Sequence, residues 1–172
     1  TVVASGRSHK RLSSLSGEAL RRGFPLEVIE IDINEDQSVK NAMSEIFSRY
    51  QKIDVLINNA GYGLWGPVGE LSINEIKSQF ETNLFAPVRM INEVLPGMIE
   101  RRSGYIINVS SVLGRLGTPF NGAYASSKFA LEGISESIRT EVKPFGVRIS
   151  LVEPGWFQTN FQNNMISSEE AN

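Results

Sequence analysis

The chain of 172 residues has no cysteine and only one histidine, and these two scarcities remove several kinds of chemistry. Without cysteine there is no disulfide, no thiolate zinc site and no cysteine nucleophile. The single histidine, His9, lies in the polar stretch Gly-Arg-Ser-His-Lys-Arg, where a solvated surface side chain is a simpler interpretation than a ligand or a base. We therefore expect no metal site.

Long apolar runs and a strong charge of one sign are also missing. No apolar stretch approaches the roughly 18 residues of a membrane span, and no charged-then-apolar leader opens the chain. The formal net charge is −2 without a run of like charges, so nothing indicates a nucleic acid or an anionic membrane. Asn108-Val109-Ser110 fits the glycosylation pattern, but it lies in an apolar run, and we interpret it as chance. We expect a cytoplasmic protein of one domain, residues 1–172, with a small-molecule partner.

Short runs rich in β-branched residues alternate with segments of helical spacing. Strands separated by helices predict βαβ units, and hence a parallel sheet with helices on both faces. In such sheets ligands bind beyond the carboxyl ends of the strands. The predicted strands are 1–5, 26–32, 53–58, 105–110 and 147–152, and the predicted helices include 36–50, 84–102 and 122–142.

Capping signals refine two of these helices and predict one more. Asn34 with Gln37 predicts a capping box for the helix at 36–50, and Ser72 with Glu75 predicts another for a following helix. Pro144 and Gly146 are expected to stop the helix at 122–142.

The stretch Gly61-x-Gly63-x-x-Gly66 has the letters of a dinucleotide fingerprint. In that motif the third glycine opens a helix whose amino terminus meets the pyrophosphate. Here Pro67 follows the third glycine and the better helix start is Ser72. We therefore predict a glycine-rich turn at a strand end, which can still touch a ligand.

Four polar residues together suggest a catalytic site. Tyr124 and Lys128 share a face of the helix at 122–142, Ser111 follows the strand at 105–110, and Asn83 lies where Pro87 must perturb a helix. Each has an ordinary alternative: a surface tyrosine beside a solvated lysine, a structural strand-end hydroxyl, and an asparagine bonded to its own backbone. Their combination favours the catalytic interpretation.

With these residues the chain resembles the short-chain dehydrogenase/reductase family from residue 1 to about residue 162. The resemblance implies an α/β fold, a three-layer Rossmann-like doubly wound parallel sheet. Residues 1–5 are similar to the family's second strand, so the chain is expected to lack the first strand, the glycine-rich phosphate loop and the first helix, and to be truncated at both ends. The motifs that carry the resemblance are Asn58-Asn59-Ala60-Gly61, Asn83, Ser111, Tyr124-x-x-x-Lys128, Pro154-Gly155 and Thr159.

The resemblance implies a role for each catalytic residue. Tyr124 is the expected acid/base, with its pKa lowered by the charge of Lys128. Lys128 also binds the nicotinamide ribose, Ser111 holds the substrate oxygen, and Asn83 places a water in a proton relay. The implied reaction interconverts a ketone and a secondary alcohol by hydride transfer.

The expected cofactor is NADP(H) rather than NAD(H). Arg7 follows the first strand, where the family's NAD users carry an acid, and its alternative role is a solvated arginine at a helix entry. Asp32 resembles the adenine-contacting aspartate, or equally starts the next turn. The other residues expected to contact the cofactor are Asn58, Ala60, Gly61, Tyr124, Lys128, Pro154, Gly155 and Thr159.

Apolar residues in the loops after strands suggest the substrate class. We expect Ser111 to bind substrate together with Leu113, Phe120 and Trp156, and Trp65 and Phe157 to add to an apolar wall. The resemblance to the branch with steroid, retinoid and acyl-ketone reductases implies a bulky apolar substrate, and a homodimer or homotetramer. The competing hypothesis is a Rossmann-like module that binds a nucleotide or a partner without turnover.

Overall fold

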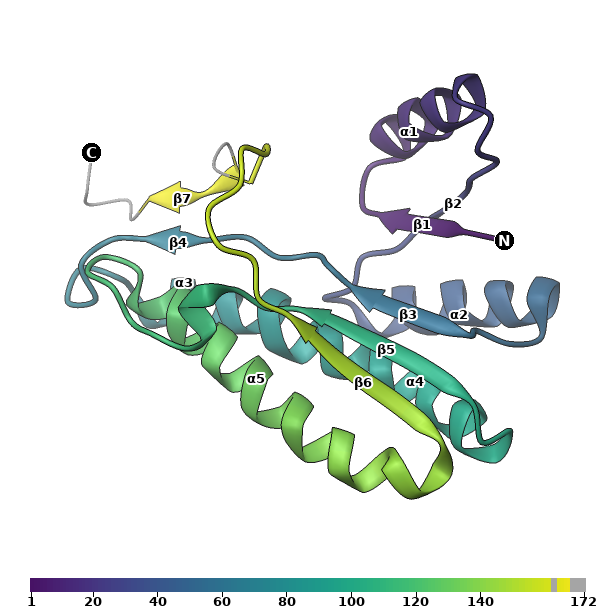
Figure 1. The fold of residues 1–172 in the computed structure, drawn as a ribbon. Helices are drawn as coiled ribbons and strands as arrows, with labels where there is room; N and C mark the ends of the chain where they lie inside the picture. Colours follow the sequence, from purple (N-terminus) through teal and green to yellow (C-terminus); the bar gives the residue numbers. More distant parts are fainter. Residues whose placement is uncertain (162–163, 168–172) are drawn as a thin grey trace. The chain divides into compact units, whose positions relative to one another are not determined.

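A computed structural model describes residues 1–161 and 164–167. The chain forms two compact units, which divide between Lys52 and Ile53. Figure 1 labels the elements of both units. That all 172 residues make one domain stays a prediction, and the two units are described separately below.

The first unit is a βαβ arrangement followed by a helix. Its two strands are parallel, with Val3 opposite Glu27 and Gly6 opposite Glu30. The helix between them begins after Ser8, whose side chain accepts a hydrogen bond from the backbone N–H of Arg11. The elements are β1 (Val3–Gly6), α1 (His9–Arg21), β2 (Glu27–Glu30) and α2 (Asp36–Tyr50).

Helix α2 confirms the helix predicted at 36–50, and its periodic apolar residues Val39, Ala42, Met43 and Ile46 are buried. The capping box predicted for it is wrong. The N-cap residue is Glu35, which makes no side-chain capping hydrogen bond. Asp32 begins a turn ahead of the helix, because its Oδ1 accepts from the backbone N–H of Asn34, and this turn moves the helix start beyond Asn34.

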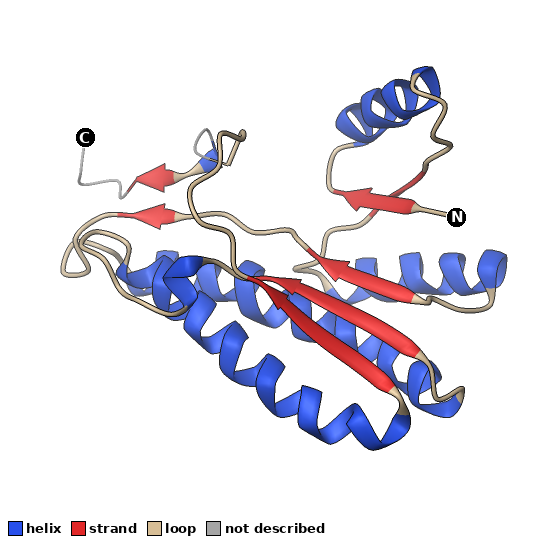
Figure 2. Ribbon diagram, viewed as in Figure 1, coloured by secondary structure: helices blue, strands red, loops and turns tan. Residues whose placement is uncertain are grey.

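The second unit contains a three-stranded parallel sheet, ordered β3-β5-β6, with all three strands running the same way (Figure 2). A second, two-stranded pairing joins β4 to β7, also in parallel. The elements are β3 (Val55–Asn58), β4 (Leu64–Trp65), α3 (Ile73–Phe80), the π-helix η1 (Glu81–Phe85), α4 (Ala86–Glu100), β5 (Gly104–Val109), the 3₁₀ turn η2 (Val112–Gly114), α5 (Gly122–Val142), the 3₁₀ turn η3 (Lys143–Phe145), β6 (Val147–Val152) and β7 (Ile166–Ser167).

These elements confirm the predicted α/β class with parallel strands. Strand β6 and helix α5 have the predicted bounds, and the capping box of α3 is present, with Ser72 and Glu75 each bonding the other's backbone N–H. The pairing of β4 with β7 was not predicted, because two-residue strands carry no periodicity.

A buried chain of polar side chains joins the sheet to α5. The Asn58 amide donates to Asn108 Oδ1 at 2.8 Å, and the Asn108 amide donates to Ser135 Oγ at 2.8 Å. Asn108 is fully buried in this chain, which supports the interpretation of its glycosylation pattern as chance. Because buried polar groups are costly when unpaired, these bonds fix α5 against the middle of the sheet.

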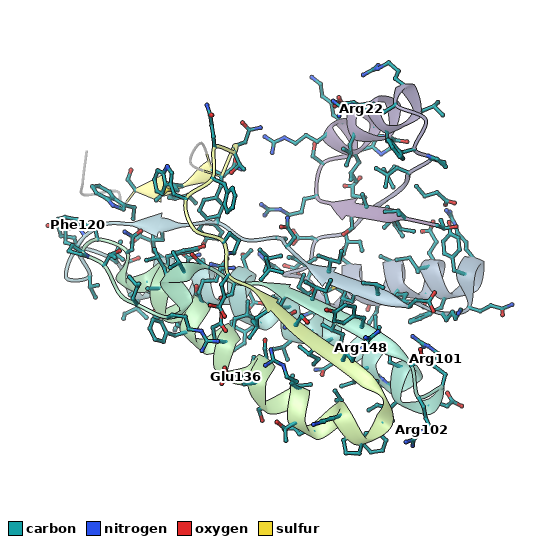
Figure 3. All side chains as sticks on the ribbon, viewed as in Figure 1. Arg22, Arg101, Arg102, Phe120, Glu136 and Arg148 are labelled. Carbon is teal, nitrogen blue, oxygen red and sulfur yellow. The ribbon has the colours of Figure 1, made fainter. Side chains whose placement is uncertain are left out.

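The turn from α5 into β6 depends on Gly146. Its φ is +73°, and a Cβ there would lie 2.6 Å from the carbonyl oxygen of Arg102. Arg102 itself donates to the Pro144 carbonyl at 2.7 Å, at the end of the sheet where β6 begins (Figure 3). The backbone of this turn therefore has no room for a side chain.

We expect Gly146→Ala to lower the free energy of unfolding by about 1–3 kcal/mol, because alanine disfavours this φ and its Cβ clashes with backbone. Gly133→Ala is the control, since Gly133 lies in α5 with nothing within 4 Å of its Cβ position. That control should be neutral or stabilising by up to about 1 kcal/mol. Urea unfolding of both variants measures the difference, and equal stabilities would contradict this account of the turn.

Candidate active site

Helix α5 brings Tyr124 and Lys128 to its buried face. They are four residues apart, and their side chains are 8% and 4% exposed. The other buried polar side chains of this helix share that face, which is unusual for a surface helix: Ser127, Glu132 and Ser135.

Ser111 lies beside Tyr124 and forms a hydrogen bond with its hydroxyl. It is the N-cap residue of η2, and its Oγ accepts a hydrogen bond from the backbone N–H of Leu113 at 3.1 Å. Burial raises the pKa of Tyr124 above its ordinary value, and the hydrogen bond to Ser111 offsets part of that rise. The pKa of Tyr124 is therefore raised and not lowered as expected, because desolvation of the hydroxyl is the largest influence on it, and the hydroxyl stays protonated at neutral pH.

Lys128 lies near the Tyr124 ring, with its Nζ 5.8 Å from the ring centroid. The Nζ donates to the carbonyl of Val109, the last residue of β5, at 2.8 Å. Burial lowers the pKa of Lys128 to about 8, against the opposing charge of Glu132. At pH 7 the amine is therefore mostly protonated, and it retains N–H groups for another acceptor.

Asn83 lies in the π-helix η1, where Pro87 follows within the first turn of α4. This irregularity fits the predicted perturbation of the helix. The Asn83 Oδ1 accepts from the backbone N–H of Tyr62 at 3.2 Å, while its amide donates to the Tyr62 carbonyl at 3.0 Å and to Ser127 Oγ at 3.1 Å. Its side chain thus connects the turn after β3 to α5.

Gln79, one helical turn before Asn83, supports the same turn and was not predicted. Its Oε1 accepts from the backbone N–H of Leu64 at 2.6 Å, and its amide donates to the Tyr62 carbonyl at 2.7 Å. Gln79 is fully buried. A spacing of four from Asn83 was the available signal for it.

The glycine-rich stretch is a turn and a short strand, not a dinucleotide fingerprint. Helix α3 begins at Ile73, seven residues after Gly66, so the third glycine opens no helix. A Cβ on Gly61 would lie 3.0 Å from Asn83 Oδ1 and 3.6 Å from Lys128 Nζ. The turn nevertheless borders the candidate site, as expected from its position.

The segment after β6 also borders the site. The Pro154 carbonyl accepts from the backbone N–H of Val112 at 2.9 Å, and nothing lies within 4 Å of a Cβ on Gly155. Thr159 Oγ1 accepts from the backbone N–H of Phe161 at 3.2 Å. The Phe161 ring lies 5.8 Å from that of Tyr124, a contact that the sequence did not predict.

Two aromatic residues predicted to contribute to the substrate pocket, Phe120 and Trp65, have ring centroids 5.3 Å apart. The Phe120 carbonyl also accepts a hydrogen bond from the Gly66 backbone N–H at 2.9 Å. Leu113 is half-buried beside Ser111. Trp156 is 84% exposed and Phe157 is 65% exposed, so these two rings are open to solvent.

The remaining predicted cofactor residues are distributed over both units. Asn58 uses its amide within the sheet, whereas Ala60 is exposed in the turn after β3. In the first unit Arg7 is exposed directly after β1. The Asp32 carboxylate accepts a hydrogen bond within its own turn, which agrees with the turn-starting alternative for this residue.

Within residues 1–161 and 164–167, no three histidine, aspartate or glutamate side chains gather as a metal ion would require. None of the helices in that part of the chain is long and apolar enough to cross a membrane.

A match to a family model identifies the family of this chain. A model described as short chain dehydrogenase matches residues 1–170. The chain belongs to the short-chain dehydrogenase family. It is 45% identical over 169 residues to retinol dehydrogenase 8 of Homo sapiens, covering 96% of this chain and 53% of that protein. It is 42% identical over 144 residues to 3-ketodihydrosphingosine reductase of Bacteroides thetaiotaomicron, covering 84% of this chain and 54% of that protein.

A solved structure with the same fold extends this relationship. A metagenomic short-chain oxidoreductase in complex with NADP has a TM-score of 0.84 at 31% identity, covering 90% of this chain and 71% of that one. The chain spans about half the length of the curated relatives it matches. The family resemblance inferred from the Ser111, Tyr124 and Lys128 motifs is therefore confirmed.

Proposed function

We propose that the whole protein containing this chain is an NADP(H)-dependent oxidoreductase that interconverts a bulky apolar ketone and a secondary alcohol. The observation that carries the proposal is the group of Ser111, Tyr124 and Lys128, joined in one buried cluster at the carboxyl end of β5. The family relationship supports the same reaction class.

The residues present fit a nicotinamide cofactor. A Cβ on Gly61 would lie 3.0 Å from Asn83 Oδ1 and 3.6 Å from Lys128 Nζ, so the missing side chain lets the turn after β3 approach these two residues closely. The ammonium group of Lys128 has N–H donors beyond the one used by Val109, and these suit ribose hydroxyls. Reduced nicotinamide, when bound, supplies the hydride for the carbonyl carbon.

Tyr124 and Ser111 act on the carbonyl oxygen in this proposal. Because burial keeps the Tyr124 hydroxyl protonated, it is ready to donate its proton to that oxygen during reduction. Ser111 has a single hydroxyl proton, which it turns from Tyr124 to the carbonyl oxygen when the substrate binds, and this hydrogen bond fixes the oxygen in place. The nearby charge of Lys128 then stabilises the phenolate that Tyr124 becomes.

The bulky apolar substrate class is supported by two observations. The names of the relatives describe a retinol dehydrogenase and a reductase of 3-ketodihydrosphingosine, both acting on long apolar molecules. The ring of Phe161 provides apolar surface beside Tyr124, and the rings of Phe120 and Trp65 pack against each other in the same unit. Turnover of long-chain ketones and retinoid aldehydes or alcohols, compared with that of small polar carbonyls, tests the class. Turnover of small polar carbonyls alone would contradict it.

NADP(H) preference is proposed from Arg7, whose exposed guanidinium follows β1 and suits a 2′-phosphate. We expect kcat/KM at least about tenfold higher with NADPH than with NADH, and Arg7→Ala should remove about tenfold with NADPH alone, equivalent to about 1.4 kcal/mol. Arg21→Ala, an exposed arginine in the last turn of α1, is the matched control. Equal efficiencies with the two cofactors, or an advantage for NADH, would refute the preference.

A further inference from the structure

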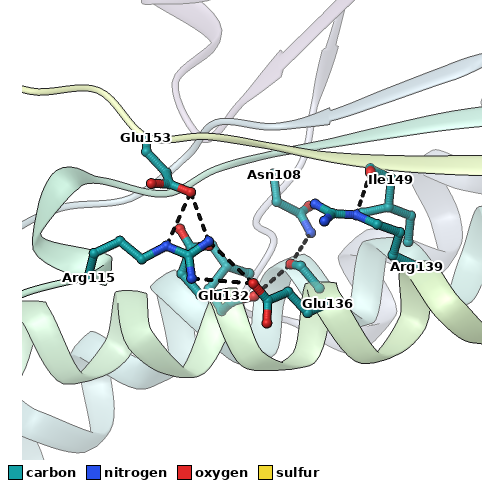
Figure 4. A network of polar contacts seen from close by, with 9 residues as sticks. Asn108, Arg115, Glu132, Glu136, Arg139, Ile149 and Glu153 are labelled. Carbon is teal, nitrogen blue, oxygen red and sulfur yellow. Dashed lines mark hydrogen bonds and ion pairs between the residues drawn. The ribbon is translucent and has the colours of Figure 1, made fainter.

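The guanidinium group of Arg115 contacts three carboxylates from two segments of the second unit (Figure 4). Its Nη2 lies 3.1 Å from Glu132 Oε2, 3.3 Å from Glu136 Oε1 and 3.0 Å from Glu153 Oε1. Arg115 follows η2, two of the carboxylates lie on α5, and the third directly follows β6. The Arg115 side chain therefore joins three parts of the chain. They are the turn that follows Ser111, the helix that carries Tyr124, and the segment that carries Pro154 and Gly155.

Glu132 differs from the other two carboxylates because it is buried. Its side chain is 4% exposed, against 52% for Glu136 and 36% for Glu153. Neither of its oxygens has a hydrogen-bond partner among the described residues, so the contact with Arg115 is an ion pair without hydrogen-bond alignment. A buried carboxylate without hydrogen bonds destabilises the folded protein. Packing alone therefore does not explain why a glutamate occupies this position.

The loop that carries Arg115 lies very close to the Glu132 carboxylate. A Cβ on Gly114 would lie 2.6 Å from Ser110 Oγ and 3.1 Å from Glu132 Oε1. Only a residue without a side chain lets η2 lie this close to α5 at this point. The Glu132 side chain thus projects from α5 and is packed against by the loop that follows Ser111.

Glu132 lies one helical turn after Lys128 on the same buried face. Burial of the Lys128 amine disfavours its charged form, and the carboxylate of Glu132 acts in the opposite direction. The catalytic interpretation requires Lys128 to be protonated. The Glu132 carboxylate favours the protonated form and so offsets part of the effect of burial on the Lys128 amine.

We propose that Glu132 is a positioning residue of the candidate active site: its buried carboxylate, held by Arg115, sustains the ammonium group of Lys128. The role concerns the charge and placement of a neighbouring catalytic group, and Glu132 itself touches neither substrate nor cofactor. This inference rests on the proposed function for its effect on catalysis, while its effect on Lys128 can be measured separately.

Other charged or titratable groups lie on elements that pack against α5, and the charge that acts on the pKa of Lys128 is that of Glu132. Glu81 has its own partner, since it pairs with Arg89 at 2.9 Å. The groups concerned are Tyr124, Glu136, Arg139 and Glu141 on α5 itself, Arg115 after η2, Glu81 in η1, Glu75 and Lys77 in α3, Lys143 in η3, Arg148 in β6 and Glu153 after it.

The first test is Glu132→Gln in the whole protein, which removes the charge and keeps the shape. Without the carboxylate, Lys128 loses its proton at lower pH, so the alkaline limb of kcat against pH for ketone reduction should move down by about one pH unit. At pH 8 we expect kcat to fall about fivefold, because the protonated fraction of Lys128 falls from about one half to about one tenth. Glu141→Gln, an exposed glutamate on the same helix, is the matched control and should leave both quantities unchanged.

The second test reads Lys128 directly and needs no turnover. The ¹³Cε resonance of Lys128, assigned by its loss in Lys128→Met, should titrate near pH 8 in the wild-type protein and about one unit lower in Glu132→Gln. Glu132→Asp keeps the charge and should restore most of the wild-type midpoint, which also covers the case in which Glu132→Gln folds poorly. A failure of the proposed function leaves this titration intact, so the two failures are distinguishable.

An unchanged Lys128 midpoint in Glu132→Gln would overturn the proposal. So would a fall in kcat that follows a fall in thermal stability while the alkaline limb stays in place, because that pattern belongs to a purely structural residue. A lower midpoint together with a limb moved to lower pH supports it.

Discussion

Tyr124→Phe is expected to lower kcat for ketone reduction by about 10³-fold, because it removes the one hydroxyl that gives its proton to the carbonyl oxygen. That loss corresponds to about 4 kcal/mol of transition-state stabilisation. The change leaves the ring in place, so the contact with Phe161 and the burial of the side chain are retained. NADPH affinity should therefore stay within about threefold of the wild-type value.

Tyr105→Phe is the matched control for this prediction. Tyr105 also carries a hydrogen-bonded hydroxyl, which lies 2.7 Å from Ser150 Oγ in the sheet. Its loss should cost about 1 kcal/mol of stability and leave kcat within about twofold. Steady-state kinetics with NADPH oxidation followed at 340 nm, together with fluorescence titration of NADPH, separate chemistry from binding. Tyr124→Phe with near wild-type kcat would remove Tyr124 from the mechanism.

Lys128→Met is expected to lower kcat/KM by about 10²-fold or more. It removes the positive charge beside the Tyr124 ring and the bond to the Val109 carbonyl. The loss should appear both in kcat, through the phenolate, and in NADPH affinity, through the ribose. Lys77→Met, an exposed lysine of α3, is the control and should leave both unchanged.

The same variant has a consequence for stability against pH. The folded-state pKa of Lys128 is about 8, below the unfolded value of 10.5, so between these values the unfolded chain binds more protons than the folded one. Stability contributed at this site therefore rises as pH increases from about 8 to 10, by an amount on the order of 3 kcal/mol in full. Urea unfolding at several pH values should show this rise in the wild-type protein and a smaller one in Lys128→Met. Equal slopes would contradict the burial of a charged lysine.

Elements with a strong local signal could be predicted from the sequence. The apolar periodicity of residues 36–50 gives α2, and the Ser72 and Glu75 pair gives the start of α3. The predicted bounds of α5 and β6 agree with the structure because proline and glycine separate them. The association of Ser111 with Tyr124 followed from the family motif rather than from periodicity.

Features that depend on distant segments could not be predicted. The pairing of β4 with β7, the Phe161 ring beside Tyr124 and the ion pair of Arg115 with Glu132 each join residues far apart in sequence. The direction of the Tyr124 pKa depends on how much the surroundings desolvate the hydroxyl, which a spacing of four residues does not reveal. The capping box at Asn34 failed because the turn begun by Asp32 moved the helix start.

The central claim is hydride transfer to a ketone with Tyr124 as the proton donor. The most direct test incubates the whole protein with NADPH that carries deuterium at both C4 positions of the nicotinamide and a panel of long-chain and retinoid carbonyls, and analyses the products by mass spectrometry. We predict alcohols that carry one deuterium at the carbinol carbon, formed by the wild-type protein and Tyr105→Phe and almost absent with Tyr124→Phe. Binding of NADPH with no deuterium in any product would contradict the account and identify a nucleotide-binding module without turnover.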